Sequence, residues 1–110
     1  MTKNYILFSG RHTCSDATDG AIFDCPVNPV DFEEMERIVR SKLDELKAGD
    51  SVNLYVTGLT AATLAVVKVC LEKCINLVAY HYDTATGTYR PQSILCVGET
   101  EAVRKERYNG

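Results

Sequence analysis

Arg11 and His12 are the side chains of this 110-residue sequence best suited to phosphoryl chemistry. The planar guanidinium of an arginine matches the oxygens of a phosphate, and a histidine can position a nucleophile or protonate a leaving group. They follow Ser9 and Gly10, directly after a short apolar run. We therefore predict Arg11 and His12 as catalytic candidates and Ser9 and Gly10 as ligand-binding candidates. The alternative is a solvated arginine and histidine at the start of a loop.

A second polar segment, Thr57-Gly58-Leu59-Thr60, leads directly into a predicted helix. The first turn of a helix carries unpaired backbone N–H groups and the positive end of the helix dipole, and both favour anions. Gly58 allows close approach of the backbone to a ligand, and Thr57, Thr60 and Thr63 add hydroxyls. We expect these residues to bind a phosphate. In the alternative, Thr60 only caps the helix and Gly58 only forms the turn. The segment is neither a P-loop nor a dinucleotide-binding glycine motif, which disfavours those nucleotide-binding classes.

His81 lies between two tyrosines on a predicted strand, and we expect it to contact the same ligand. The alternative is a histidine that is hydrogen-bonded within the core or at an interface. Cys70 and Cys74 are one helical turn apart, but no C-x-x-C pair exists and both lie in an apolar helix, so we predict no metal and no cofactor. A nucleophile formed by Cys14 with His12 is a further alternative.

Apolar periodicity predicts the elements that must position these side chains. Strands are expected at residues 5–8, 21–23, 52–57, 77–82 and 94–97, helices at 31–48 and 60–75, and an antiparallel return at 88–90 that ends at Pro91. Strands that alternate with helices indicate a parallel sheet. The predicted fold class is α/β: a small Rossmann-like, mainly parallel sheet flanked by helices, either three-layered or open, with a C-terminal antiparallel hairpin. Ligands of such sheets bind beyond the carboxyl ends of the strands, where the three polar segments fall.

The first predicted helix has clear start and stop signals. Asp31 is expected to cap it, with Glu34 three residues later as in a capping box. Val30 and Met35 are spaced to form a hydrophobic staple. Gly49 is expected to follow its last turn.

The second predicted helix is apolar on most of its circumference. Lys68, Glu72 and Lys73 mark a narrow polar face. Such a helix is typically buried. We expect it to lie against the sheet on one side and against a second subunit on the other, so that the protein is a homodimer.

Composition restricts the classes of partner. The chain is 45% apolar and 25% charged with a net charge of −3, so a duplex nucleic-acid surface is not expected. No apolar run approaches the roughly 20 residues of a membrane span, and no secretory signal is recognised at the start. We therefore predict a cytoplasmic protein whose five cysteines are reduced. We predict one domain over residues 1–110, in which the charged tail 99–110 is either a short helix or mobile.

The stretch 52–92, from V-N-L-Y-V-T-G-L-T to T-Y-R-P-Q, resembles the core of small CRISPR-associated Rossmann-fold proteins, the CARF family and its ring-nuclease relatives. The strand–turn–Thr–helix element and the strand that follows carry this likeness. It implies that two subunits pair and bind a cyclic oligoadenylate across the dimer axis. Residues 9–12 and Thr57, Gly58 and Thr60 would then form the binding loops. Some relatives cleave the ring with a ribose 2′-hydroxyl as the nucleophile.

Three functions follow from these observations. The first is homodimeric binding of a phosphorylated small ligand, with a cyclic oligonucleotide as one candidate. The second is a metal-independent phosphodiesterase or ring nuclease built on the same site. The third is a non-catalytic interaction protein of a phage or mobile element, whose partner surfaces would be the apolar face of residues 61–75 and the final hairpin.

Overall fold

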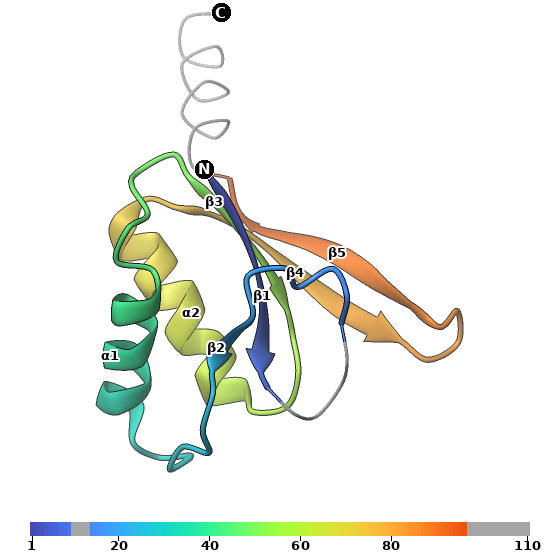
Figure 1. The fold of residues 1–110 in the computed structure, drawn as a ribbon, viewed down its shortest axis with the longest axis horizontal. Helices are drawn as coiled ribbons and strands as arrows, with labels where there is room; N and C mark the ends of the chain where they lie inside the picture. Colours follow the sequence, from blue (N-terminus) through green and yellow to red (C-terminus); the bar gives the residue numbers. More distant parts are fainter. Residues whose placement is uncertain (10–13, 97–110) are drawn as a thin grey trace, which may run out of the picture.

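The computed structural model describes residues 1–9 and 14–96 (Figure 1). Its strands form one sheet in the order β2-β1-β3-β4-β5, in which the first four run parallel and β5 pairs antiparallel with β4. The predicted α/β fold is thereby confirmed. The tail 99–110, for which a prediction was also made from the sequence, lies outside the described residues. The elements are β1 (Thr2–Phe8), β2 (Ala21–Phe23), α1 (Phe32–Lys42), β3 (Ser51–Tyr55), α2 (Thr60–Lys73), β4 (Asn76–Asp83) and β5 (Thr88–Leu95).

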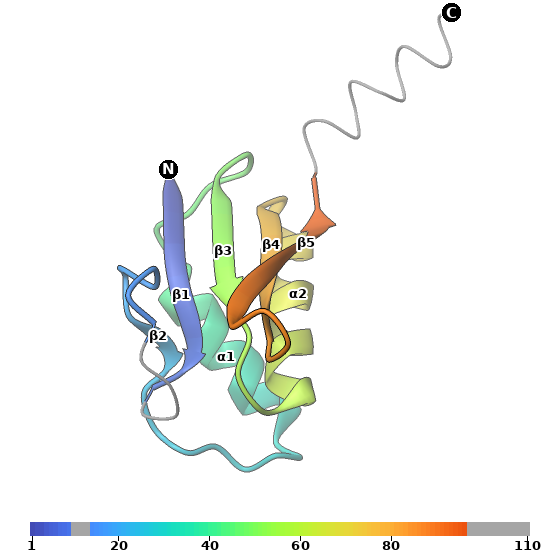
Figure 2. The same cartoon turned by 90° about the vertical axis from the view of Figure 1, so that its right-hand side faces the viewer.

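Both helices pack on the same face of the sheet, so the described part of the chain has two layers (Figures 1 and 2). Alternate residues of the strands point to this face, where the helices cover them. Of the two arrangements that the sequence left open, the described residues show the open one, with no helix on the second face of the sheet. The fully buried side chains of this main core include Leu7, Met35, Val39, Val52, Leu54, Val66, Val69 and Leu77.

The opposite face of the sheet is covered by a loop and by tyrosines instead of helices. Ile6, Ala21 and Tyr55 form a second, smaller buried cluster on this face. This cover explains why three consecutive residues of β1, from Tyr5 to Leu7, are all buried. The side chains that pack against the cluster from outside are Cys14, Ala17, Tyr80 and Tyr89.

The start of α1 follows its sequence signals only in part. The Asp31 carboxylate accepts a hydrogen bond from the backbone N–H of Glu34 at 3.2 Å, as predicted for the cap. The predicted staple is wrong, because Val30 is 70% exposed while Met35 is fully buried.

The end of α1 lies earlier than predicted. The helix stops at Lys42, with Leu43 as its C-cap, instead of continuing to residue 48. Turns follow, in which the Leu46 N–H donates to the Leu43 carbonyl at 3.0 Å. Both leucines are buried. The helical spacing of apolar residues therefore continues beyond the end of the helix itself.

The C-terminal hairpin is longer than predicted. Pro91 does not end the returning strand, since β5 passes through it opposite Tyr80 and reaches Leu95. Ile94 therefore belongs to the hairpin and not to a separate strand, and Val97 lies outside the described residues. Among the residues that are described, no helix has the length and apolar character needed to cross a membrane.

The position of the main core predicts that substitutions of two valines differ clearly in their effect on stability. Val52 on β3 is fully buried and Val30 is 70% exposed. Val52→Ala should lower the free energy of unfolding by about 2–3 kcal/mol, through lost apolar burial and a residual cavity. Val30→Ala should change it by less than about 0.5 kcal/mol. Urea denaturation measures both, and equal effects would contradict the assignment of the core.

Candidate functional site

The polar segments predicted from the sequence lie at the carboxyl edge of the parallel strands, toward which the arrows of β1 and β3 point in Figure 2. Ser9 directly follows β1, and Thr57 follows β3 by two residues. His81 lies one residue beyond Tyr80, which pairs with the last residue of β3. The register therefore brings these three positions to one edge. Gly10, Arg11 and His12, predicted for the same edge, lie outside the described residues.

Thr57 joins the ends of two strands. The residue is only 6% exposed, and its Oγ1 accepts a hydrogen bond from the backbone N–H of Phe8 at 3.2 Å. The contact ties the last residue of β1 to the loop that follows β3. The oxygen of Thr57 thus supports the loop conformation that starts α2.

The first turn of α2 has no side-chain cap. Leu59 is the N-cap, in an extended conformation, and it makes no side-chain hydrogen bond to the turn. Gly58 before it has a φ of 81°, a region that favours glycine. The first turn contains no acidic residue, whereas α1 is capped by Asp31. Thr60 is therefore the first helical residue and not the cap, so the alternative reading of this residue is wrong.

Two of the other predicted hydroxyls are engaged with the backbone. The Ser9 hydroxyl donates to the Asp24 carbonyl at 3.3 Å, beside the loop that follows β2. The Thr63 hydroxyl donates to the Leu59 carbonyl at 3.5 Å, one turn earlier in its own helix. Ser9 and Thr60 are exposed at the edge, while Thr63 is half-buried.

His81 is held by the hairpin. Its Nε2 lies 2.8 Å from the Oε1 of Gln92 on β5, and the histidine is exposed to solvent. The neighbouring Thr57 and Thr60 instead belong to the loop and helix that follow β3. The structure thus places His81 at the predicted edge but gives its ring a partner on the outermost strand.

A cavity of about 290 Å³ opens at the same edge, beside Ser9 and Leu59. Stacked rings of Phe8 and Phe23, with centroids 5.0 Å apart, form part of its wall. This cavity was not predicted from the sequence, because most of its lining comes from a segment predicted to be a loop. The two prolines in Cys-Pro-Val-Asn-Pro, which stiffen the chain, were the available signal. The remaining lining residues are Asp24, Cys25, Pro26, Val27 and Pro29.

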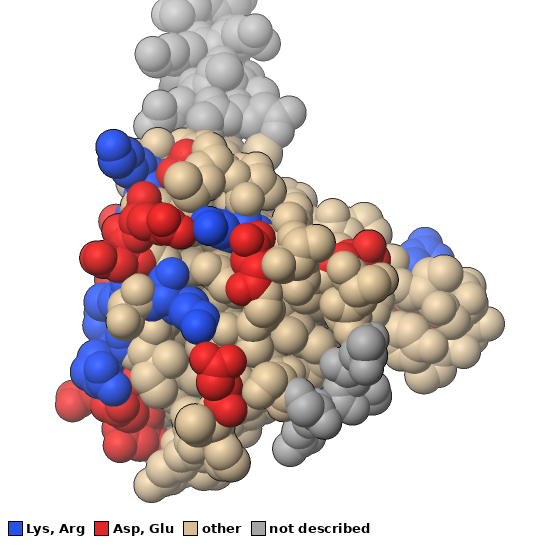
Figure 3. Space-filling view, viewed as in Figure 1, with Lys and Arg blue, Asp and Glu red and all other residues tan. Residues whose placement is uncertain are grey.

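Charged side chains of the described residues contribute little electrostatic attraction for anions at this edge. Asp24 at the cavity forms an ion pair with Lys42, with the Nζ 3.3 Å from Oδ2. In Figure 3 the charged side chains gather over the helical layer, and acidic ones extend toward the lower left of the view. Within the described residues, the groups here that attract anions are thus mainly backbone N–H groups.

The cysteines of the described residues do not form a metal site. The described residues contain no disulfide, and no three His, Cys, Asp or Glu side chains of this part gather closely enough to hold a metal ion. Burial raises the pKa of the Cys70 thiol to about 12, with a small opposing effect of Lys73. Cys70 therefore acts as a small apolar side chain of the core.

No protein-family model matches this chain, and neither a curated protein nor a solved structure was found to match it. The resemblance to CARF proteins therefore stays a prediction. The chemistry of the carboxyl edge has to be inferred from this chain's own side chains and backbone groups.

The contact between Thr57 and Phe8 predicts a specific effect on stability. Thr57→Val removes the acceptor and leaves the N–H of Phe8 without its partner, which should cost about 1–3 kcal/mol of unfolding free energy. Thr57→Ser keeps the acceptor and loses one methyl group, so it should cost about 1 kcal/mol. Denaturant titration compares the two, and a valine variant as stable as the serine variant would argue against the contact.

The burial of Cys70 predicts its reactivity. At pH 8 the thiol remains protonated, since its pKa is about 12, and the thiolate is the reactive species. A thiol reagent should therefore modify the exposed Cys25 and Cys74 in the native protein while Cys70 reacts only after unfolding. Mass spectrometry of digested protein locates the labels. Rapid native labelling of Cys70 would mean that α2 opens readily.

Proposed function

We propose that this chain binds a small phosphorylated ligand at the carboxyl edge of its sheet and acts as a homodimer. A cyclic oligonucleotide is one such ligand. The observation that carries the proposal is the start of α2, which has neither a side-chain cap nor an acidic residue in its first turn. The protein itself thus leaves donors there that a phosphate can use.

The donors for the phosphate are the first backbone N–H groups of α2. They belong to Thr60, Ala61 and Ala62, since the N–H of Thr63 already donates to the Leu59 carbonyl at 3.3 Å. The helix dipole adds a partial positive charge at this point. The exposed hydroxyl of Thr60 supplies one further donor.

The cavity beside the helix start supports a ligand with an apolar part. Leu59 both caps α2 and lines the cavity, so the two features adjoin. The walls formed by Phe8, Phe23 and Val27 suit a flat, weakly polar group better than a second phosphate. We infer a ligand whose phosphate contacts α2 while its uncharged body enters the cavity.

Catalysis is an outcome of the test and not part of the proposal. A ring nuclease or phosphodiesterase at this edge would use Arg11 and His12, which lie outside the described residues. Incubation with cyclic oligoadenylates and analysis of the products would identify such an activity. An unaltered ring at high protein concentration would leave binding as the function.

Thermal unfolding with a panel of phosphorylated compounds tests the binding. The panel should include inorganic phosphate, mononucleotides, linear dinucleotides and cyclic oligoadenylates. A ligand at about 100 times its Kd should stabilise the native state by about 2.7 kcal/mol. If no compound raises the midpoint, the proposal fails.

Thr60→Asp provides a sharper test than simple loss of a side chain. The new carboxylate should repel the phosphate and abolish the ligand-induced shift. In the free protein it should raise stability by about 0.3–1 kcal/mol, because a negative charge at a helix N-terminus is favourable. Thr60→Ser is the matched control and should still bind. A variant that is stabilised and still responds to the ligand would place the phosphate elsewhere.

A further inference from the structure

The outer face of α2 is apolar and exposed. Leu64 and Leu71 are 59% and 60% exposed, while Ala62, Val66 and Val69 on the inner face are buried. The helix predicted to be largely buried is therefore covered on one side only. Exposed leucines on a small domain are significant when they line up, because a row of them forms a surface suited to a partner.

A shallow groove runs between α1 and α2 next to Leu64. It has a volume of about 220 Å³, and the exposed ring of Phe32 forms its wall on α1. Ala61 and Ala65 contribute small side chains, which leave room for a large side chain from outside. The outer surface of the helices thus carries both an apolar groove and, at Leu71, an apolar projection.

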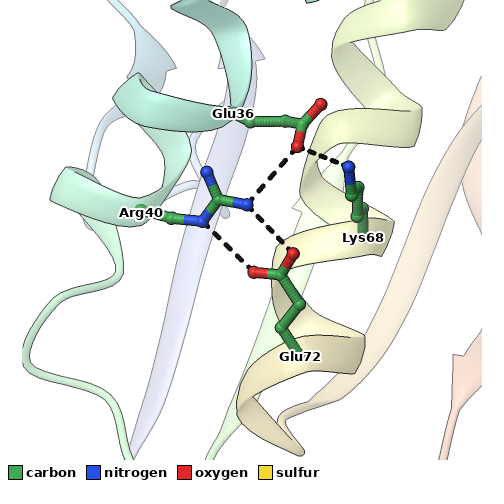
Figure 4. Close-up of polar contacts among 4 residues, drawn as sticks. All are labelled: Glu36, Arg40, Lys68 and Glu72. Atoms are coloured by element: carbon green, nitrogen blue, oxygen red, sulfur yellow. Dashed lines mark hydrogen bonds and ion pairs between the residues drawn. The ribbon is translucent and has the colours of Figure 1, made fainter. Parts of the chain in front are cut away.

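Four charged side chains form a network at this groove (Figure 4), and two of them, Glu36 and Lys68, belong to its lining. Lys68 Nζ lies 2.8 Å from Glu36 Oε1. Arg40 Nη2 lies 2.9 Å from Glu72 Oε1 and 3.4 Å from Glu36 Oε1. Two acids and two bases balance, so this network adds no net charge to the surface, although the whole chain carries −3.

We infer that a second copy of this chain covers the groove, with its α2 antiparallel to the first α2 about a two-fold axis. Leu64 and Leu71 are seven residues apart, which is close to two helical turns, so both lie on one face. In the antiparallel arrangement Leu71 of each copy meets Leu64 and the groove of the other. The same contact is made twice, as a two-fold interface requires.

A second copy fits this surface better than an unrelated helix or peptide does. The groove needs an apolar projection on a helix, and each copy brings one in Leu71. The contact is self-complementary and closes at two chains. The inference specifies the interface of the homodimer proposed above. It does not rest on the ligand, since neither leucine belongs to the carboxyl edge.

Sedimentation velocity of the full chain over roughly a hundred-fold range of concentration tests the inference. The wild-type protein should reach twice the mass of one chain. Leu64→Lys and Leu71→Glu should each raise the dimer dissociation constant at least about ten-fold. Because both leucines are exposed in the single chain, the variants should keep their circular dichroism spectra. Tyr82→Lys on the hairpin, 55% exposed, is the matched control and should leave the dimer intact.

Mixing the two variants tests the antiparallel register. The lysine of Leu64→Lys should face the glutamate of Leu71→Glu, so the mixture should form a heterodimer although neither variant associates alone. A monomeric wild-type chain overturns the inference, as does a dimer that both variants leave unchanged. Failure of the mixture to associate overturns the antiparallel register. None of these outcomes depends on whether a phosphorylated compound binds.

Discussion

The packing of both helices against one face of the sheet is the constraint on which the other features depend. Leu7, Val52 and Leu54 are fully buried beneath α1 and α2. A sheet of five strands has two faces, however, and this chain has two helices in its described part. The second face must therefore be protected in another way, and the outer side of the helices is left without a third layer.

The second face is protected by aromatic rings. Tyr55 stacks on Tyr80 at 4.7 Å and meets the edge of Tyr89 at 5.1 Å. Burial raises the pKa of Tyr55, with Asp16 as a smaller contributor in the same direction. Tyrosines suit this position because their rings cover apolar surface while their hydroxyls reach water. The outer face of α2 has no comparable cover, and this difference between the two surfaces is the basis for placing a second chain on the helices.

The order of the elements was predictable from the sequence, because each strand and each helix is marked by its own pattern of apolar residues. The short strand β2, for example, is only three residues long, but all three are apolar between turn residues. The end of α1 was wrong for a physical reason: Leu43 and Leu46 keep a helical spacing while they lie in turns. Periodicity reports which residues are buried and cannot distinguish a helix from successive turns that bury the same side chains.

The sequence predicted which edge of the sheet carries the candidate site. It did not predict the contacts that the site residues make there. The rule for parallel strands placed Ser9, Thr57 and His81 together, since it depends only on strand direction. The hydrogen bond from the Phe8 N–H to Thr57 joins positions 49 residues apart, and no local pattern encodes it. The cavity was not predictable for the same reason, since Leu59 comes close to Phe8 and Phe23 only in the tertiary fold.

Both edge strands of the sheet are poor templates for pairing with a further strand. β2 contributes only two registered pairs, and β5 carries Pro91, which has no N–H to donate. A neighbouring molecule therefore finds no long, regular ladder to extend. The shortness of β2 and the proline of β5 thus restrict edge-to-edge pairing between copies of the domain.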